Sequence, residues 1–225
     1  MNTDIIDKLT AQVTELHFAE NLPENLFGFT LQKIFAPDND RFVFYTYSNE
    51  ENHCALTVYF HTETMEFKVR RRIGLTEFCL TNFFTQDFTR FKEMIDANLE
   101  TEIKILRDVM TPKANRFIDE KKIPKWTYGL NLPETLEGFR LFIKPSAPVE
   151  ITNGSFIVID YVDFAINSDF IIYFNIFGDE FSGESRVNGA THVTYDFDSK
   201  TLKYLEDKLK NKLADKLREI RSQAQ

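Results

Sequence analysis

The side chains able to do metal or nucleophilic chemistry are few and lie far apart in the sequence. They are four histidines and two cysteines, at His17, His53, His61, His192, Cys54 and Cys79. A structural zinc site needs ligands at short spacings such as C-x₂-C or H-x₃-H, and the chain has none. His53 and Cys54 are adjacent, so on a strand they point to opposite faces of the sheet. The sequence therefore predicts no metal site and no cofactor.

Motifs of catalysis and of nucleotide binding are missing as well. Neither a G-x-S-x-G elbow nor a glycine-rich phosphate loop occurs. The acidic turn Asp38-Asn39-Asp40 lacks the glycine and the distal glutamate of an EF-hand loop. Paired carboxylates such as Asp160 and Asp163 are interpreted as strand ends and turns. We predict that the protein is not an enzyme. A Cys79–His61 pair can still assemble in space, which keeps an enzyme of unrecognised type as the third hypothesis.

One basic segment, Lys68-Val69-Arg70-Arg71-Arg72, interrupts an otherwise acidic half of the chain. On a strand, Lys68, Arg70 and Arg72 share one face, where they can bind an anionic group or a protein partner. The alternative interpretation is a solvated strand face whose charges discourage edge-to-edge aggregation.

Aromatic residues dominate the apolar composition, with 23 phenylalanines against 8 glycines. As strands, segments 42–47 and 170–174 would be apolar on both faces, whereas antiparallel sheets usually leave one face polar. Either another element covers the second face or an aromatic surface binds a ligand. Tyrosine joins a large apolar ring to a polar tip, which suits it to such a surface. Tyrosines related in pairs by 114 residues are therefore the candidate ligand-binding residues: Tyr47 with Tyr161, and Tyr59 with Tyr173.

The elements that position these residues follow an internal repeat. NLPENLFGFTL at 21–31 recurs as NLPETLEGFRL at 131–141, with eight of eleven positions identical at an offset of 110 residues. Farther along the chain the offset becomes 114 and stays constant through the strands and the final helix, which indicates a duplication. We predict an α+β fold made of two pseudo-symmetric copies of a helix–antiparallel sheet–long helix unit. The first copy spans residues 1–110 and the second spans residues 111–225.

Apolar periodicity and turn residues place the elements of each copy. A first helix is expected at 3–18, with a shorter counterpart at 113–121, and long amphipathic helices are expected at 87–109 and 199–222. Asp87 or Thr85 is the expected N-cap of the first long helix, and Asp198 or Ser199 that of the second. The expected strands are 27–35, 41–48, 54–62, 65–73 and 77–84, then 138–144, 155–165, 169–177, 181–187 and 190–197. Short connections imply antiparallel pairing, and the two sheets join edge to edge or stack face to face.

Charge and hydropathy exclude several classes of partner. The net charge of −8 argues against binding to nucleic acid, which needs a basic surface. No apolar run is long enough to span a bilayer, and acidic residues occupy the place of the basic region of a signal peptide. We therefore expect a cytoplasmic protein with free cysteines and with neither nucleic acid nor membrane as a partner.

The leading functional hypothesis is a non-enzymatic binding protein. It would hold a small apolar ligand or a peptide in an aromatic cleft, or on a sheet face, between the two copies. The second hypothesis is an adaptor for protein–protein interaction, with the basic strand and the lysine-rich C-terminal helix as its surfaces. No motif identifies the ligand or the partner.

Overall fold

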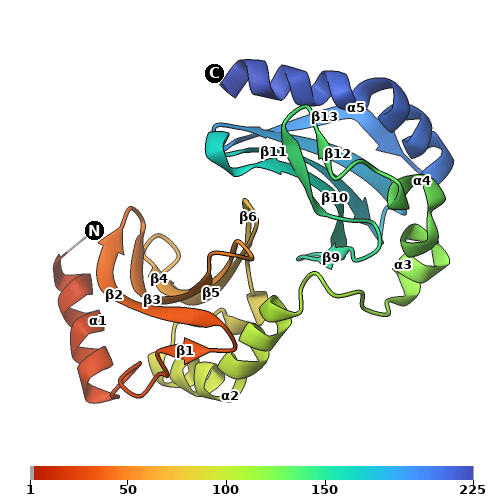
Figure 1. Cartoon of the computed structure of the whole chain (residues 1–225). Coiled ribbons are helices and arrows are strands. Elements are labelled where there is room, and N and C mark those ends of the chain that lie inside the picture. Colours follow the sequence, from red (N-terminus) through yellow and green to blue (C-terminus); the bar gives the residue numbers. More distant parts are fainter. Residues whose placement is uncertain (1–2, 225) are drawn as a thin grey trace. The chain divides into compact units, whose positions relative to one another are not determined.

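A computed structural model describes residues 3–224 of the chain. The chain is an α+β protein with two antiparallel sheets, of six and seven strands. It divides into two compact units, Met1–Asp108 and Val109–Gln225, and each contains one sheet and one long helix (Figure 1). The α+β class and the antiparallel pairing predicted from the sequence are confirmed.

The first unit contains two helices and six strands. In chain order these are α1 (Thr3–Glu15), β1 (Asn25–Leu26), β2 (Phe29–Asp38), β3 (Arg41–Asn49), β4 (Cys54–His61), β5 (Glu66–Ile73), β6 (Thr76–Cys79), the 3₁₀ turn η1 (Thr81–Phe83) and α2 (Phe88–Arg107). Neighbouring strands in the sheet are also neighbours in the sequence, because each turn is too short for a parallel crossover.

The second unit begins with three short helical segments instead of one helix. Its elements are α3 (Arg116–Glu120), η2 (Ile123–Lys125), α4 (Thr127–Leu130), β7 (Thr135–Leu136), β8 (Phe139–Ile143), β9 (Val149–Glu150), β10 (Ser155–Asp163), η3 (Phe164–Ile166), β11 (Ser168–Asn175), β12 (Glu180–Val187), β13 (Ala190–Ser199) and α5 (Leu202–Ala224). The sheet order is β7-β8-β10-β11-β12-β13, and β9 pairs with β10.

Corresponding strands of the two units have the same bounds at an offset of 114 residues. Adding 114 to the bounds of β3, β4 and β5 gives those of β10, β11 and β12, and the same offset relates the first residues of α2 and α5. The pairing register also shifts at the same place, between Val43 and Tyr45 in β3 and between Ile157 and Ile159 in β10. A β-bulge at each position bends the strand and increases the local twist.

The long helices bury apolar stripes against one face of each sheet. In the first unit α2 packs on β4 and β5, where the Phe67 ring lies 5.0 Å from that of Phe88 and 5.2 Å from that of Phe91. In the second unit α5 packs on β11, β12 and β13 through Leu205, Leu209, Leu213, Leu217 and Ile220. Phe88 and Phe91 of α2 therefore correspond, 114 positions later, to Leu202 and Leu205 of α5.

Of the N-caps predicted for the two long helices, that of α2 is confirmed and that of α5 is wrong. Asp87 caps α2, since its carboxylate accepts a hydrogen bond from the Arg90 amide at 3.1 Å. Neither Asp198 nor Ser199 caps α5, because β13 continues through Ser199. The Thr201 hydroxyl accepts the Tyr204 amide hydrogen bond at 3.3 Å instead. The longer strand moves the helix start by about one turn.

The buried stripe of α5 predicts that substitutions at neighbouring positions differ sharply in their effect on the free energy of unfolding. Leu209→Asp places a charge in the core and should lower the free energy of unfolding by more than about 3 kcal/mol. Asn211→Asp, on the exposed side of the same turn, should change it by less than about 0.5 kcal/mol. Urea denaturation followed by circular dichroism measures both. Equal midpoints for the two variants would contradict the packing of α5 on its sheet.

Candidate functional site

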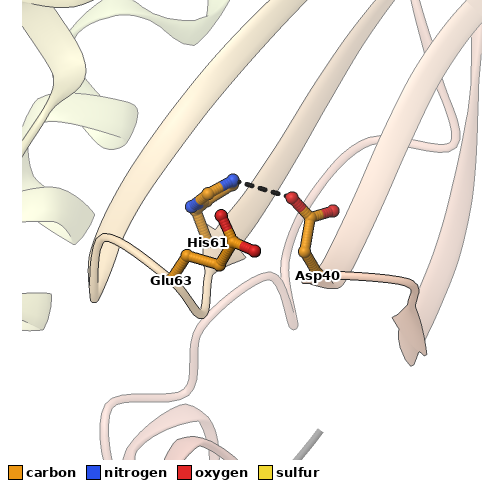
Figure 2. Close-up of side chains that lie close together, drawn as sticks. All are labelled: Asp40, His61 and Glu63. Atoms are coloured by element: carbon orange, nitrogen blue, oxygen red, sulfur yellow. Dashed lines mark ion pairs between the residues drawn. The ribbon is translucent and has the colours of Figure 1, made fainter.

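Among the described residues, one group of side chains has metal-ligating atoms within 4.8 Å of one another: Asp40, His61 and Glu63 (Figure 2). Asp40 lies in the turn between β2 and β3, and His61 ends β4. The pairing of Arg41 with His61 brings the two segments together, so sequence spacing alone gave no signal of the group. His61 Nε2 lies 2.9 Å from Asp40 Oδ2.

Both ring nitrogens of His61 are already occupied. Nε2 faces the Asp40 carboxylate, and Nδ1 accepts a hydrogen bond from the Thr64 amide at 3.3 Å. A metal ion at this position would have to displace both partners from the imidazole. The residue 114 positions later, Asn175, closes the same turn, because its Oδ1 accepts the Gly178 amide at 2.9 Å. An amide can replace the imidazole in capping a turn, so the geometry gives His61 a structural role.

Tyr47 and Tyr161 hold equivalent segments of chain onto their sheets. Each ring is fully buried, and each hydroxyl donates a 2.7 Å hydrogen bond, to the carbonyl of Pro23 and of Pro133 respectively. Burial raises the pKa of Tyr47 to about 12, so its hydroxyl remains a donor at neutral pH. These contacts explain why the two tyrosines recur together with the Asn-Leu-Pro segments.

Tyr59 and Tyr173 lie on the sheet face that points away from the long helices. Phe60 faces α2, and the adjacent Tyr59 therefore faces the other way. The Tyr59 ring is buried, and its hydroxyl lies 3.1 Å from Cys79 Sγ. Tyr173 is partly exposed and donates a 3.3 Å hydrogen bond to Glu184. Of the four predicted tyrosines, Tyr173 is the one whose ring keeps some contact with solvent.

The predicted basic face exists, but acidic side chains compensate much of its charge. Lys68, Arg70 and Arg72 pair across to Tyr59, Thr57 and Ala55, which places all three on one face of the sheet. Lys68 lies 3.0 Å from Glu66, Arg70 contacts Glu77, and Arg72 lies 4.0 Å from Glu50. An anion would therefore have to compete with carboxylates that are already in place.

The corresponding face of the second unit contains buried acids that the sequence interpretation misplaced. Asp160 was expected at a strand end, but it lies in the middle of β10 and is fully buried. Neither of its carboxylate oxygens has a hydrogen-bond partner among the described residues. Asp169 is also buried, with Arg186 Nε 3.7 Å from its Oδ2. Burial raises the pKa of Asp160 and raises that of Asp169 to about 7.

Two hollows flank α1 in the first unit. The first, which we name the Phe42 hollow, has a volume of about 350 Å³ and is lined by Val13, Phe18, Phe35 and Phe42 among others. The second, which we name the Phe67 hollow, has a volume of about 400 Å³, and its apolar lining is Leu9, Phe60, Met65 and Phe67. Both lie where α1 meets the aromatic face of the sheet.

The hollows exist because α1 covers that face incompletely. Leu9 is buried, whereas Ile6 and Val13 remain partly exposed. Phe18, which lies just beyond the helix, packs closely on the sheet and on α2. Its ring lies 5.1 Å from that of Phe88 and 5.4 Å from that of Phe44. The residues on either side, His17 and Ala19, have positive φ angles of 48° and 66°. Non-glycine residues in this conformation carry strain, which the burial of Phe18 offsets.

The second unit has an equivalent aromatic pair within its buried core. Ile118, Ile123 and Trp126 belong to the buried core that contains the aromatic pair Phe174 and Phe181. Phe174 and Phe181 stand 114 positions after Phe60 and Phe67, and each pair is directly cross-strand. The equivalent pair in the first unit, Phe60 and Phe67, is likewise buried, and the Phe67 hollow lies beside it next to α1.

Comparisons with known proteins leave the geometry as the sole guide to function. The chain matches no protein-family model, no curated protein and no solved structure. Within residues 3–224, no helix has both the length and the apolar character needed to cross a membrane.

The buried acids predict a pH dependence of stability. Folded Asp169 keeps its proton up to about pH 7, whereas an unfolded aspartate releases it near pH 4. Between these values the folded state binds more protons, so Asp169 makes the free energy of unfolding fall as pH rises. Asp169→Asn should make this fall shallower and leave the part that buried Asp160 contributes, whereas exposed Asp207→Asn should retain the fall in full. Urea titrations at several pH values between 4 and 7.5 test this, and parallel profiles for wild type and Asp169→Asn would contradict it.

Proposed function

We propose that the protein binds a small apolar ligand within its first unit, between α1 and the aromatic face of the sheet. The observation that carries the proposal is the Phe67 hollow, whose floor is the Phe60–Phe67 pair and whose walls are Leu9 and Met65. Its volume of about 400 Å³ falls in the range of small-molecule sites, about 300–1,000 Å³.

The lining of the Phe67 hollow supports binding rather than chemistry. Its apolar surface gives a ligand favourable burial, at roughly 25 cal/mol for each Å² removed from water. Its polar groups are Lys8, Gln12 and Gln86, none of which is paired with a nucleophile or a second acid–base group in the described structure. Lys8, Leu9 and Gln12 lie on one side of α1, so one face of the helix forms this wall of the hollow.

We also propose that the two units are copies of one duplicated unit. The shared strand bounds support this, as do the paired hydrogen bonds of Tyr47 to Pro23 and of Tyr161 to Pro133.

Filling the Phe67 hollow from α1 tests the proposed function. The wild-type protein should bind the apolar dye Nile red, and decanol should displace it. Gln12→Trp places an indole in the hollow and should weaken binding of both at least about tenfold, which corresponds to about 1.4 kcal/mol. Ala11→Trp adds the same side chain on the exposed side of α1 and should leave binding unchanged.

Fluorescence titration measures these affinities, and circular dichroism checks that both variants fold. The proposal fails if the wild type binds neither compound. It fails equally if Gln12→Trp binds them as tightly as Ala11→Trp does.

A further inference from the structure

The turns that connect β4 to β5 and β11 to β12 differ at one position beside the aromatic pairs. Met65 immediately precedes β5, and Asp179, 114 positions later, immediately precedes β12. Both have positive φ angles, 55° for Met65 and 49° for Asp179. Aspartate is one of the few residues enriched in this conformation, whereas methionine is not. Met65 therefore occupies a backbone position that suits aspartate better.

In the second unit an ion pair closes over the aromatic floor. Lys121 Nζ lies 2.6 Å from Asp179 Oδ1. The same ammonium group lies 5.3 Å from the ring centre of Phe174 and 5.8 Å from that of Phe181, within range of cation–π attraction. Lys121 is supplied by the C-terminal end of α3. A lysine, a carboxylate and two mutually tilted phenylalanine rings thus form one cluster.

In the first unit the aromatic pair recurs without the carboxylate. The ring centres of Phe60 and Phe67 are 4.9 Å apart, as close as the 5.0 Å of Phe174 and Phe181. Lys8 lines the hollow above them, and Met65 replaces the aspartate. Lys8 forms no ion pair with any residue that the structure describes, and the lining of the Phe67 hollow includes no acidic side chain. The described lining of the hollow therefore combines an apolar floor with one positive charge, that of Lys8.

We propose that the ligand of the Phe67 hollow is a monocarboxylate with an apolar tail, such as a medium-chain fatty acid. The tail lies on the Phe60–Phe67 floor, and the carboxylate meets Lys8, taking the part that Asp179 plays in the second unit. Gln12 and Gln86 offer amide donors to the same carboxylate at the mouth of the hollow. This inference rests on the proposed function and adds the chemical class of the ligand to it.

An ion pair between the ligand carboxylate and the exposed Lys8 predicts a modest but measurable preference for a carboxylate over an uncharged ligand. Decanoate should bind about fivefold more tightly than decanol, which has the same tail and no charge, and more tightly still than decylamine. Raising the salt concentration should reduce the preference for decanoate, because the lysine is exposed to solvent. Lys8→Gln should abolish the preference for decanoate over decanol.

The decisive variant supplies the missing carboxylate from the protein itself. Met65→Asp should form an ion pair with Lys8 and lower decanoate affinity about tenfold relative to Met65→Asn. Asparagine is the matched control, because it has nearly the same shape, accepts the same backbone conformation and carries no charge. Both variants should bind decanol equally. Calorimetry on the full chain measures the affinities, and the partial exposure of Met65, 44%, favours folding of both variants.

The outcomes separate the carboxylate inference from the proposed function. If decanol binds the wild type as tightly as decanoate does, or if Met65→Asp and Met65→Asn bind decanoate equally, the carboxylate inference is wrong while the binding site stands. If neither compound binds the wild type, the proposed function fails and the inference fails with it. Should a Met65 variant not fold, the comparison of decanoate with decanol in Lys8→Gln decides the question.

Discussion

The structure depends on covering the aromatic face of each antiparallel sheet. Large aromatic rings on this face, such as Phe67 and its counterpart Phe181, would leave extensive apolar surface in water if the long helix were absent. Helices α2 and α5 supply most of the cover through stripes of phenylalanine or leucine. The segment that precedes each sheet supplies the rest, and its quality of fit differs between the two units.

That difference in fit links the fold to the proposed site. In the second unit, Ile118, Ile123 and Trp126 belong to the same buried core as Phe174 and Phe181, and Lys121 forms an ion pair with Asp179 beside that pair. In the first unit the cover is a regular helix anchored mainly by Leu9 and Phe18, so volume remains on both of its sides. Close packing is the rule in protein interiors, so the volume that remains beside α1 is a candidate ligand space. A ligand with a tail and a carboxylate meets both requirements of the Phe67 hollow.

Much of the architecture could be predicted from the sequence, whereas the site could not. Alternating apolar residues and the 114-residue offset placed most strands within one or two residues of their observed bounds, because strand pairing follows local pattern. The burial of Asp160 was missed, since a single acid in an apolar strand resembles a turn residue until neighbouring strands enclose it. The hollows were missed because their volume depends on how closely α1 fits the sheet. Periodicity records which face of a helix is apolar, but not how well that face fills the space beneath it.

The central claim is that α1 is an incomplete cover over a ligand site. Amide hydrogen exchange read by mass spectrometry tests it most directly, because exchange rates report how often each segment opens. The account predicts that α1 exchanges faster than α2 in the free protein, and that saturating decanoate slows exchange in α1 and in the β4–β5 turn while α5 is unaffected. Protection of α1 equal to that of α2, with no change on adding decanoate, would contradict it.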